Sequence, residues 1–247
     1  MNKLEFKDYG LTIKLTPFIN IIGGPGSGKT MLLRMLINNV YNPNIYLDEV
    51  KVLDLDLTFK KQNIAACLDL KFNTSSVKEE LVYYQEKCGI DIKTIFDNLD
   101  RFSAFFNLEE LINQKVSALN IYDRALIRIL SLLIIKPKIL GIDNLFTYLD
   151  LEQKTRIIKF AKEQKITILN ITSNSEELLL GIDIIVLDNH QVKAYDKTKA
   201  VLSNEKLLAS VGFDLPFVVN LSNGLKYYQV VDKEYYDIKS LVGALWQ

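Results

Sequence analysis

The sequence has 247 residues, of which 49% are apolar, enough to bury one sizeable core and a smaller appended unit. Basic and acidic residues balance to a formal net charge of zero, so charge gives no reason to expect nucleic acid or an anionic membrane surface as a partner. The N-terminus forms no apolar signal core, and the longest apolar run, Ile129 to Ile135, is too short to cross a bilayer. We therefore expect a cytoplasmic protein whose membrane association is peripheral.

The first strand that we single out leads into a glycine-rich loop. Residues Phe18–Ile22 are apolar and rich in β-branched side chains, and paired glycines follow at once, which predicts a buried strand entering a tight turn. Apolar residues from Leu32 to Val40 then recur at helical spacing until Asn42-Pro43 breaks the pattern. Strand, loop and helix thus follow in the order that a phosphate-binding P-loop requires.

The loop itself matches the pattern G-x-x-x-x-G-K-[ST]. Its glycines let backbone N–H groups approach phosphate oxygens, and the helix that follows adds the positive end of its dipole. The lysine of this pattern reaches the β- and γ-phosphates, and the threonine hydroxyl ligates Mg²⁺. The sequence therefore predicts ATP with Mg²⁺ as the ligands, bound by Gly23, Gly24, Pro25, Gly26, Ser27, Gly28, Lys29 and Thr30.

Further strands and helices are expected along the rest of the chain. Strands are predicted at Ile45–Leu47, Ile64–Leu68, Lys138–Ile142, Ile166–Ile171 and Ile184–Leu187, and helices over most of 77–135, at Leu151–Gln164 and near Glu176. The alternation of strand and helix after residue 136 predicts a parallel sheet covered by helices. We divide the chain into a nucleotide-binding core at 1–68 and 136–200, an inserted helical subdomain at 69–135, and a C-terminal accessory or dimerisation segment at 201–247.

A P-loop also needs a second carboxylate that organises Mg²⁺ at the end of an apolar strand, and the sequence offers two candidates. The pair Asp48-Glu49 follows the short strand soon after the P-loop helix. Asp143 follows a later apolar strand and is preceded by a long apolar helix and Pro137. A P-loop kinase that used Asp48 and Glu49 would leave the later motifs unexplained, so we favour Asp143.

The order of these motifs makes the chain resemble the ATP-binding cassette (ABC) ATPases across nearly its whole length. In this resemblance Asp143 matches the Walker B aspartate, which shares Mg²⁺ with Thr30, and Thr147–Asp150 matches the D-loop. The segment Val116–Asn120 falls at the LSGGQ signature, which contacts the nucleotide of a partner subunit through Ser117, Ala118, Leu119 and Asn120. The implied fold is α/β: a P-loop NTPase with a RecA-like parallel sheet core, an inserted helical subdomain and a small C-terminal domain.

Two further stretches resemble the ATPase subunits of energy-coupling factor (ECF) transporters, which import vitamins and metal ions. They are Phe72–Leu81, after the Q-loop, and Leu207–Phe217, similar to a segment that helps such subunits pair. The resemblance implies a homo- or heterodimer with a second ATPase subunit at the cytoplasmic face of the cell membrane. It also implies a transmembrane scaffold subunit and a separate membrane subunit that binds the nutrient.

Several positions depart from the family pattern. Asn144 stands where the family has the glutamate that polarises the attacking water, and Ser173 stands where it has the switch histidine. Ala118 and Leu119 replace signature glycines, and the only histidine, His190, is expected in an exposed turn. Because these positions are replaced, we expect no intact catalytic residue. Positioned general bases commonly contribute about 10²–10⁴ in rate, so we expect an impaired hydrolytic site.

Two functions fit this pattern. The chain is either the ATP-binding subunit of an ECF-type importer, in which the assembled complex couples ATP binding and hydrolysis to micronutrient transport, or a catalytically inert ATP-binding structural or regulatory subunit of an ABC complex. Tyr9 is a candidate for stacking on adenine, but a simple β-hairpin residue is an equal interpretation.

Overall fold

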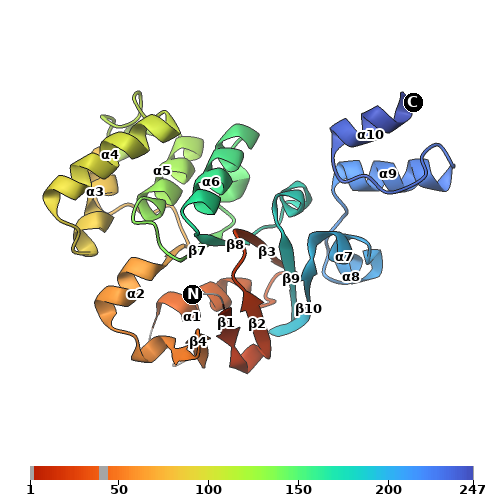
Figure 1. The fold of residues 1–247 in the computed structure, drawn as a ribbon, viewed down its shortest axis with the longest axis horizontal. Coiled ribbons are helices and arrows are strands. Elements are labelled where there is room, and N and C mark those ends of the chain that lie inside the picture. Colours follow the sequence, from red (N-terminus) through yellow and green to blue (C-terminus); the bar gives the residue numbers. More distant parts are fainter. Residues whose placement is uncertain (1–2, 39–43, 247) are drawn as a thin grey trace.

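A computed structural model describes residues 3–38 and 44–246 of the chain. The predicted helix breaker Asn42-Pro43 lies outside the described residues. Within them, two β-sheets and the surrounding helices form the fold shown in Figure 1. No helix in the described part of the chain is long and apolar enough to cross a membrane.

The larger sheet has six strands in the order β10-β9-β3-β8-β7-β6, all parallel except the edge strand β10. Its central strands are buried on both faces, which explains their continuous apolar runs. The five strands predicted for this sheet are confirmed with small shifts at their ends, whereas β10 was not predicted. The strands are β3 (Phe18–Gly23), β6 (Ile64–Cys67), β7 (Ile139–Asp143), β8 (Thr167–Ile171), β9 (Asp183–Asp188) and β10 (Gln191–Lys197).

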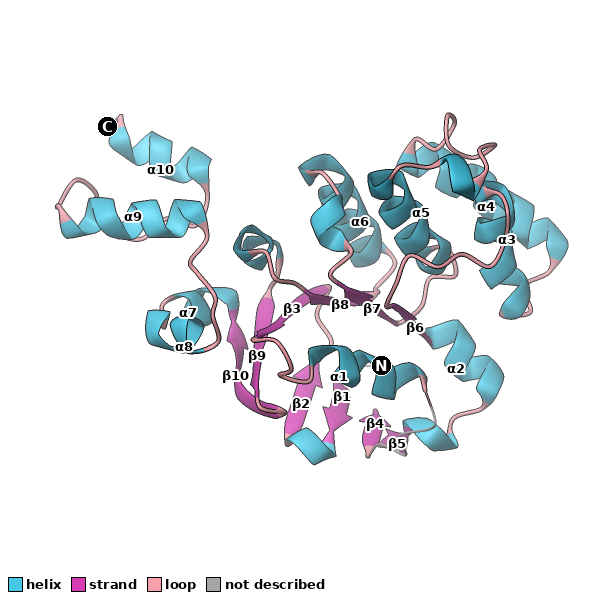
Figure 2. Cartoon of the chain, turned by 180° about the vertical axis from the view of Figure 1, so that it is seen from behind, coloured by secondary structure: helices cyan, strands magenta, loops and turns pink. Residues whose placement is uncertain are grey.

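A second sheet of four antiparallel strands lies below the first in Figure 2. Its order is β2-β1-β4-β5, and β2 alternates buried and exposed residues because only one of its faces packs on the core. The predicted strand Ile45–Leu47 is confirmed, and it belongs to this sheet. The strands are β1 (Lys3–Phe6), β2 (Leu11–Lys14), β4 (Ile45–Leu47) and β5 (Val50–Lys51), with the 3-10 turn η1 (Lys7–Tyr9) between the first two.

Helices cover both faces of the six-stranded sheet. On one face, α1 (Lys29–Ile37) packs on the side chains of β3 and β7 together with the antiparallel sheet. On the other, α5 (Ile121–Leu133) and α6 (Leu151–Glu163) pack on β7 and β8, and α3 and α4 pack beyond α5 (Figures 1 and 2). The predicted helical stretch is α3 (Val77–Lys87), α4 (Ile92–Phe106), the 3-10 turn η4 (Val116–Ala118) and α5, while α2 (Leu57–Asn63) precedes β6.

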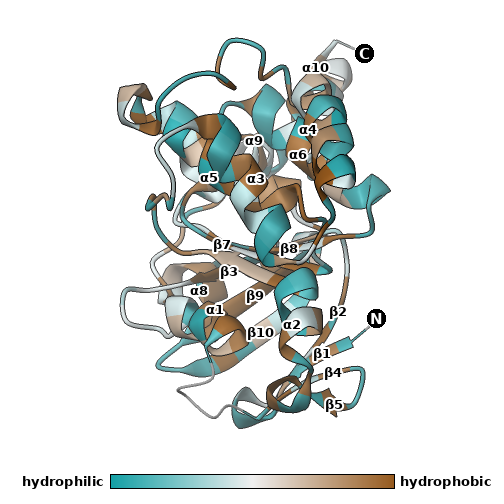
Figure 3. Cartoon of the chain, turned by 90° about the vertical axis from the view of Figure 1, so that its left-hand side faces the viewer, coloured by the Kyte–Doolittle hydropathy of each residue, from teal (hydrophilic) through white to brown (hydrophobic). Residues whose placement is uncertain are grey.

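The C-terminal segment adds helices at the β9 and β10 end of the sheet, in blue in Figure 1. A third apolar cluster joins them to the sheet through Ile184 and Val186 of β9. Their bounds are α7 (Thr198–Leu202), α8 (Glu205–Ser210), α9 (Phe217–Tyr227) and α10 (Ile238–Leu245). Figure 3 shows apolar residues concentrated on the strands between the two helical layers.

Strands β3, β8 and β7 are parallel neighbours in the sheet, so their carboxyl ends meet at one edge. Open α/β sheets bind ligands at this edge.

Candidate functional site

The P-loop is held by close contact with neighbouring backbone. A side chain at Gly23 would place its Cβ 2.1 Å from the Leu187 carbonyl oxygen of β9, so only glycine fits. Gly28, the N-cap of α1, has φ +97°, a conformation that favours glycine. The chain therefore leaves β3, turns tightly and enters α1 with the first backbone N–H groups of the helix unbonded within it.

Lys29 lies over its own loop. Its Nζ donates to the carbonyl oxygens of Gly23, at 2.7 Å, and Gly24, at 2.8 Å, and to Ser27 Oγ at 3.2 Å. Burial lowers the pKa of Lys29, and the negative charge of Asp143 partly opposes that shift. The ammonium group is thus poised in the loop, where phosphate oxygens can replace the carbonyl oxygens as its acceptors.

Thr30 and Asp143 meet across the sheet edge. The Thr30 Oγ1 hydroxyl donates to Asp143 Oδ2 at 2.6 Å, which joins the start of α1 to the end of β7. These two oxygens fit Mg²⁺, which prefers oxygen ligands and is held by one or two protein groups together with phosphates. The described residues contain no group of three or more His, Cys, Asp or Glu side chains placed to hold a metal.

The other candidate carboxylates lie elsewhere. Asp48 and Glu49 form the turn between β4 and β5 of the antiparallel sheet, both with positive φ. Asp48 Oδ1 accepts a hydrogen bond from the Lys3 backbone N–H at 3.1 Å. Of the two candidates, Asp143 is therefore the one that the structure brings to the P-loop.

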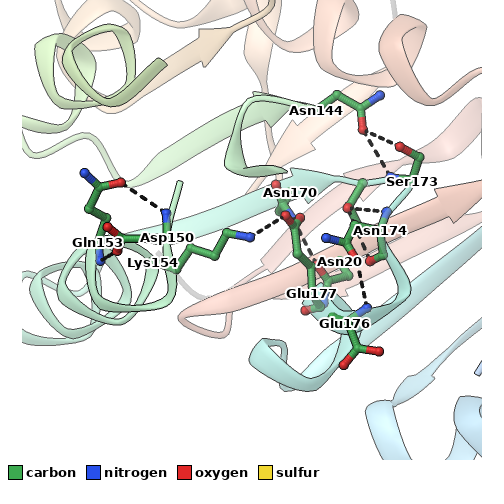
Figure 4. A network of polar contacts seen from close by, with 11 residues as sticks. Asn20, Asn144, Asp150, Gln153, Lys154, Asn170, Ser173, Asn174, Glu176 and Glu177 are labelled. Carbon is green, nitrogen blue, oxygen red and sulfur yellow. Dashed lines mark hydrogen bonds and ion pairs between the residues drawn. The ribbon is translucent and has the colours of Figure 1, made fainter. Parts of the chain in front are cut away.

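Asn144 and Ser173, which follow β7 and β8, bind each other through hydrogen bonds. Asn144 Oδ1 accepts from the Ser173 backbone N–H at 3.1 Å and from Ser173 Oγ at 3.2 Å, as Figure 4 shows. Asn144 has φ +56°, which asparagine tolerates better than most residues. An amide and a hydroxyl can orient a water molecule through hydrogen bonds, but neither accepts a proton near neutral pH. The pair joins the loops that follow β7 and β8.

His190 lies against the P-loop, a contact that sequence reasoning missed. It occupies the turn between β9 and β10 and is exposed, as predicted. Its backbone N–H donates to the Ser27 carbonyl oxygen at 3.1 Å, and its Nδ1 lies 2.7 Å from the place of a Cβ on Gly28. His190 therefore supports the outside of the loop through packing. No local sequence pattern indicates this contact, because it depends on the pairing of β3 with β9.

The residues predicted to form the signature lie at the start of α5. Ser117 and Ala118 are exposed, whereas Leu119 is buried in the core, so its bulk does not face a partner. Asn120 is the N-cap of α5, and its Oδ1 accepts from the backbone N–H groups of Tyr122 and Asp123 at 2.9 Å each.

Two residues of this helix start were missed by the sequence analysis. Tyr122 is 60% exposed, and Asp123 Oδ2 accepts from Asn120 Nδ2 at 2.6 Å. Tyr122 and Asp123 lie in the first turn of α5, and their backbone N–H groups already donate to Asn120 Oδ1. The helix preference for acidic residues in the first turn is the signal that points to Asp123.

Tyr9 lies in η1, in the turn between β1 and β2, as the hairpin interpretation predicts. Its ring packs edge-on against Phe6 with the ring centroids 6.5 Å apart, and burial raises its pKa.

An apolar groove of about 370 Å³ opens among α1, α2, β6, α3 and α5. Its described lining residues include the basic side chains of Lys60, Lys61, Lys87 and Arg128, and none of them is acidic. Arg128 is 8% exposed; its Nη1 donates to Tyr84 Oη at 2.9 Å, but its buried Nε has no partner among the described residues. The groove thus combines an apolar wall with an incompletely satisfied buried cation.

The chain is similar to known proteins in sequence and in fold. A family model described as ABC transporter matches residues 6–147. The energy-coupling factor transporter ATP-binding protein EcfA1 of Mesomycoplasma hyopneumoniae (strain 7448) is 24% identical over 100% of this chain and 93% of its own length. EcfA1 of Streptococcus agalactiae serotype Ia is 22% identical over 98% of this chain and 91% of its own.

Two solved structures share the fold. One is described as cbiO1 from Clostridium perfringens, part of the ABC transporter complex cbiONQ. It has a TM-score of 0.69 at 20% identity and covers 86% of this chain and 90% of its own. The dimeric structure of MJ0796, a bacterial ABC transporter cassette, has a TM-score of 0.65 at 18% identity over 76% of this chain and 89% of its own. Because the family model matches more than half of the 247 residues, the chain belongs to the ABC transporter family and has the P-loop NTPase fold of its ATPase cassettes.

Proposed function

We propose that this chain is the ATP-binding subunit of an ECF-type ABC importer and that its own hydrolytic site is impaired. The observation that carries the proposal is the convergence of Lys29, Thr30 and Asp143 beside an Asn144–Ser173 pair that holds no proton-accepting group. The full-length similarity to proteins named EcfA1 supports the ECF assignment. In the assembled complex, ATP binding and hydrolysis would drive the import of a micronutrient.

The ligand would be ATP with Mg²⁺. The backbone of the loop from Gly23 to Gly28 would surround the phosphates, and Lys29 would neutralise part of their charge. Thr30 and Asp143 would hold Mg²⁺, which neutralises charge on the phosphates when bound. The loop conformation and the 2.6 Å contact between Thr30 and Asp143 support these roles because they bring the hydroxyl and the carboxylate together beside the P-loop.

Slow hydrolysis follows from the residues beside the phosphates. Without a carboxylate at position 144, loss of a general base costs about 10²–10⁴ in rate. The alternative function, an inert ATP-binding structural or regulatory subunit, is supported by the same substitution together with Tyr122 and Asp123 at the α5 terminus. The two functions differ in whether ATP at this P-loop matters for turnover of the complex.

The proposed partner at the C-terminus is a second ATPase subunit. Phe217 and Leu221 on α9 are 63% and 42% exposed, and Ile238 and Val242 on α10 are 62% and 44% exposed. Each pair is spaced by four residues, which places both members on one face of their helix. Exposed apolar faces of this kind mark protein interaction sites. The dimeric structure of the similar cassette MJ0796 supports pairing of two ATPase units.

The proposed partner at the groove is the transmembrane scaffold, at the cytoplasmic face of the membrane. The apolar lining and the cations at Lys60, Lys61 and Arg128 suit an apolar helix of that subunit with an acidic side chain. The substrate-binding membrane subunit would attach through the scaffold. We further propose that 1–68 with 136–200, 69–135 and 201–247 act as the core, the helical subdomain and the C-terminal dimerisation segment.

The test is purification of the tagged chain from native membranes in mild detergent. We expect a second ATPase subunit, whether a copy of this chain or a different one, and a transmembrane scaffold to co-purify. Arg128→Met should reduce recovery of the scaffold, whereas the matched exposed control Arg101→Met on α4 should not. Recovery of the chain alone in every preparation would contradict the importer assignment.

A second measurement separates the two functions. Turnover and transport are compared for complexes that contain wild type or Lys29→Ala. If both rates fall, ATP at this site takes part in the work of the importer. If both rates stay unchanged while the complex remains assembled, the chain is the inert subunit.

A further inference from the structure

A cluster of four buried polar residues lies beneath the loops that flank the P-loop, and Figure 4 shows it. Asn20 of β3, Lys154 of α6, Asn170 of β8 and Glu177 of the 3-10 helix η6 (Ser175–Leu180) form this buried polar cluster. Asn20 and Asn170 are fully buried, and Glu177 is 1% exposed. They are cross-strand and interhelical neighbours, and none belongs to the nucleotide-binding residues described above.

Direct hydrogen bonds hold the cluster together. Glu177 accepts from Lys154 Nζ at 2.9 Å through Oε1 and from Asn170 Nδ2 at 3.1 Å through Oε2. Asn170 Nδ2 also donates to Asn20 Oδ1 at 3.1 Å, and Asn20 Nδ2 donates to the Glu177 carbonyl oxygen at 3.0 Å. A Cβ on Gly181 would lie 2.5 Å from Asn20 Nδ2, so this glycine leaves room for the asparagine.

Stability alone does not account for such an arrangement. Removing two charges from water costs several kcal/mol per ion, and replacing a buried ion pair by apolar residues is often neutral or stabilising. Asn170 Oδ1 also has no hydrogen-bond partner in the described part of the chain. The cluster fixes the position of η6 relative to three other elements at an energetic cost.

Those elements all lead to the nucleotide site. Asn20 lies in β3, which enters the P-loop at Gly23, and Lys154 lies one turn into α6, whose N-cap is Asp150 of the D-loop. At the other end of η6, Asn174 caps the helix by accepting from the Glu176 backbone N–H at 3.0 Å, directly after Ser173. The loops after β7 and β8 are therefore joined by Asn144 with Ser173, and the helices that follow these loops, α6 and η6, are joined by Lys154 with Glu177.

The same 3-10 helix contacts the C-terminal helices. Glu176 Oε1 accepts from the Phe217 backbone N–H at 2.6 Å, at the first residue of α9. This carboxylate satisfies a free N–H group of the helix and lies at the positive end of its dipole. The helix η6 thus connects Ser173, which precedes its N-cap, with Phe217 at the start of α9.

We propose that Lys154 and Glu177 are positioning residues: they fix η6 so that Ser173 stays beside the terminal phosphate, and η6 transmits ATP occupancy through Glu176 to α9 and α10. The proposal rests on the proposed binding of ATP at the P-loop. It deepens that function, because it gives the subunit a way to report a γ-phosphate to its own C-terminal helices.

The chain contains one tryptophan, Trp246, which is 86% exposed at the end of α10 and serves as a fluorescent reporter of these helices. Trp246 emission is recorded with saturating MgATP or MgADP, at a protein concentration where sedimentation shows no nucleotide-dependent change in mass. We expect MgATP, and not MgADP, to change the emission. Glu176→Ala should abolish this response and leave the MgADP affinity unchanged, while the MgATP affinity changes only by the free energy of the lost coupling.

The second readout is the ratio of the MgATP and MgADP dissociation constants, measured by calorimetry together with thermal unfolding. Lys154→Met and Glu177→Gln should reduce the preference for ATP about 2- to 10-fold, the effect of one net hydrogen bond. Lys154→Arg, which keeps the charge, should retain the preference, as should the exposed control Lys159→Met on the same helix. A purely structural role would lower the unfolding temperature and change both affinities equally.

The outcomes are distinct. An unchanged ATP preference in both Lys154→Met and Glu177→Gln, or a wild-type Trp246 emission that ignores MgATP, overturns the positioning proposal and leaves ATP binding intact. Failure of the wild type to bind either nucleotide overturns the proposed function and this proposal together. Loss of the ATP preference with retention of MgADP affinity supports the proposal even where a variant unfolds at a lower temperature.

Discussion

The P-loop and the loops after β7 and β8 lie at the same edge of the sheet, yet they carry different chemistry. The P-loop presents a cation at Lys29 and a hydroxyl at Thr30 that already contacts Asp143. The neighbouring loops present Asn144 and Ser173, whose polar atoms satisfy each other. The first region presents groups that can bind phosphate, whereas the amide of Asn144 and the hydroxyl of Ser173 do not accept a proton near neutral pH.

This difference separates the free energy of nucleotide binding from the activation free energy of hydrolysis. Binding depends on the charges and backbone donors of the loop, which are present in the folded chain. Hydrolysis depends on interactions made in the transition state, for which a positioned base is needed. A subunit can therefore keep its affinity for ATP after its own chemical step has become slow.

The largest effect is expected for Asn144→Glu, which adds the missing carboxylate. Single-turnover hydrolysis in the assembled complex should rise about 10²–10⁴-fold if the general base is the main deficit. The control is Asn144→Gln, which has the same length and no basic carboxylate. Both substitutions place a longer residue at φ +56°, with a strain of about 1 kcal/mol, so both should unfold at a slightly lower temperature.

Equal turnover for Asn144→Glu and Asn144→Gln would show that the lack of a base at position 144 is not what distinguishes these loops from the P-loop. It would mean that the site lacks more than a base, and it would favour the inert subunit.

A smaller effect, on binding, is expected for Lys29→Ala. Lys29 is the cation proposed to face the phosphates, and charge-assisted hydrogen bonds contribute about 1.5–3 kcal/mol each, so the affinity for MgATP should fall about 10²-fold. Calorimetry on the purified chain measures the change. Lys162→Ala, in the exposed last turn of α6, is the matched control and should bind as the wild type does. Unchanged affinity in Lys29→Ala would show that nucleotide is held elsewhere.

The local part of this picture could be predicted from the sequence. The P-loop, the flanking strand and helix and the strand before Asp143 follow from apolar periodicity and glycine spacing, because these signals act over a few residues. The choice of Asp143 over Asp48 rested on motif order. The structure adds the physical reason, since Asp48 lies in the turn of a separate sheet.

Contacts between distant segments could not be predicted. His190 reaches Ser27 only because β9 pairs with β3, and Asn20 faces Asn170 only because the register of β3 and β8 places them side by side. The burial of the Leu119 side chain could not be predicted either, because a shift of one residue at a 3-10 turn decides whether a side chain enters the core. Such features depend on strand order and register, which a single sequence does not encode locally.

The smallest effect is expected at the start of α5, where the subunit would contact its partner's nucleotide. Asp123 places a carboxylate in the first turn of this helix, where it satisfies the dipole and repels an incoming phosphate. Asp123→Asn keeps the shape and removes the charge, so MgATP-dependent association of the ATPase subunits should tighten about 2- to 5-fold, the effect of 0.3–1 kcal/mol. The helix itself should lose a similar amount of stability.

Sedimentation velocity with and without MgATP measures the association. The control is Asp100→Asn on α4, an exposed residue away from this end. Association that weakens in Asp123→Asn would mean that the carboxylate attracts the partner, and the α5 terminus would then be an intact contact rather than an impaired one.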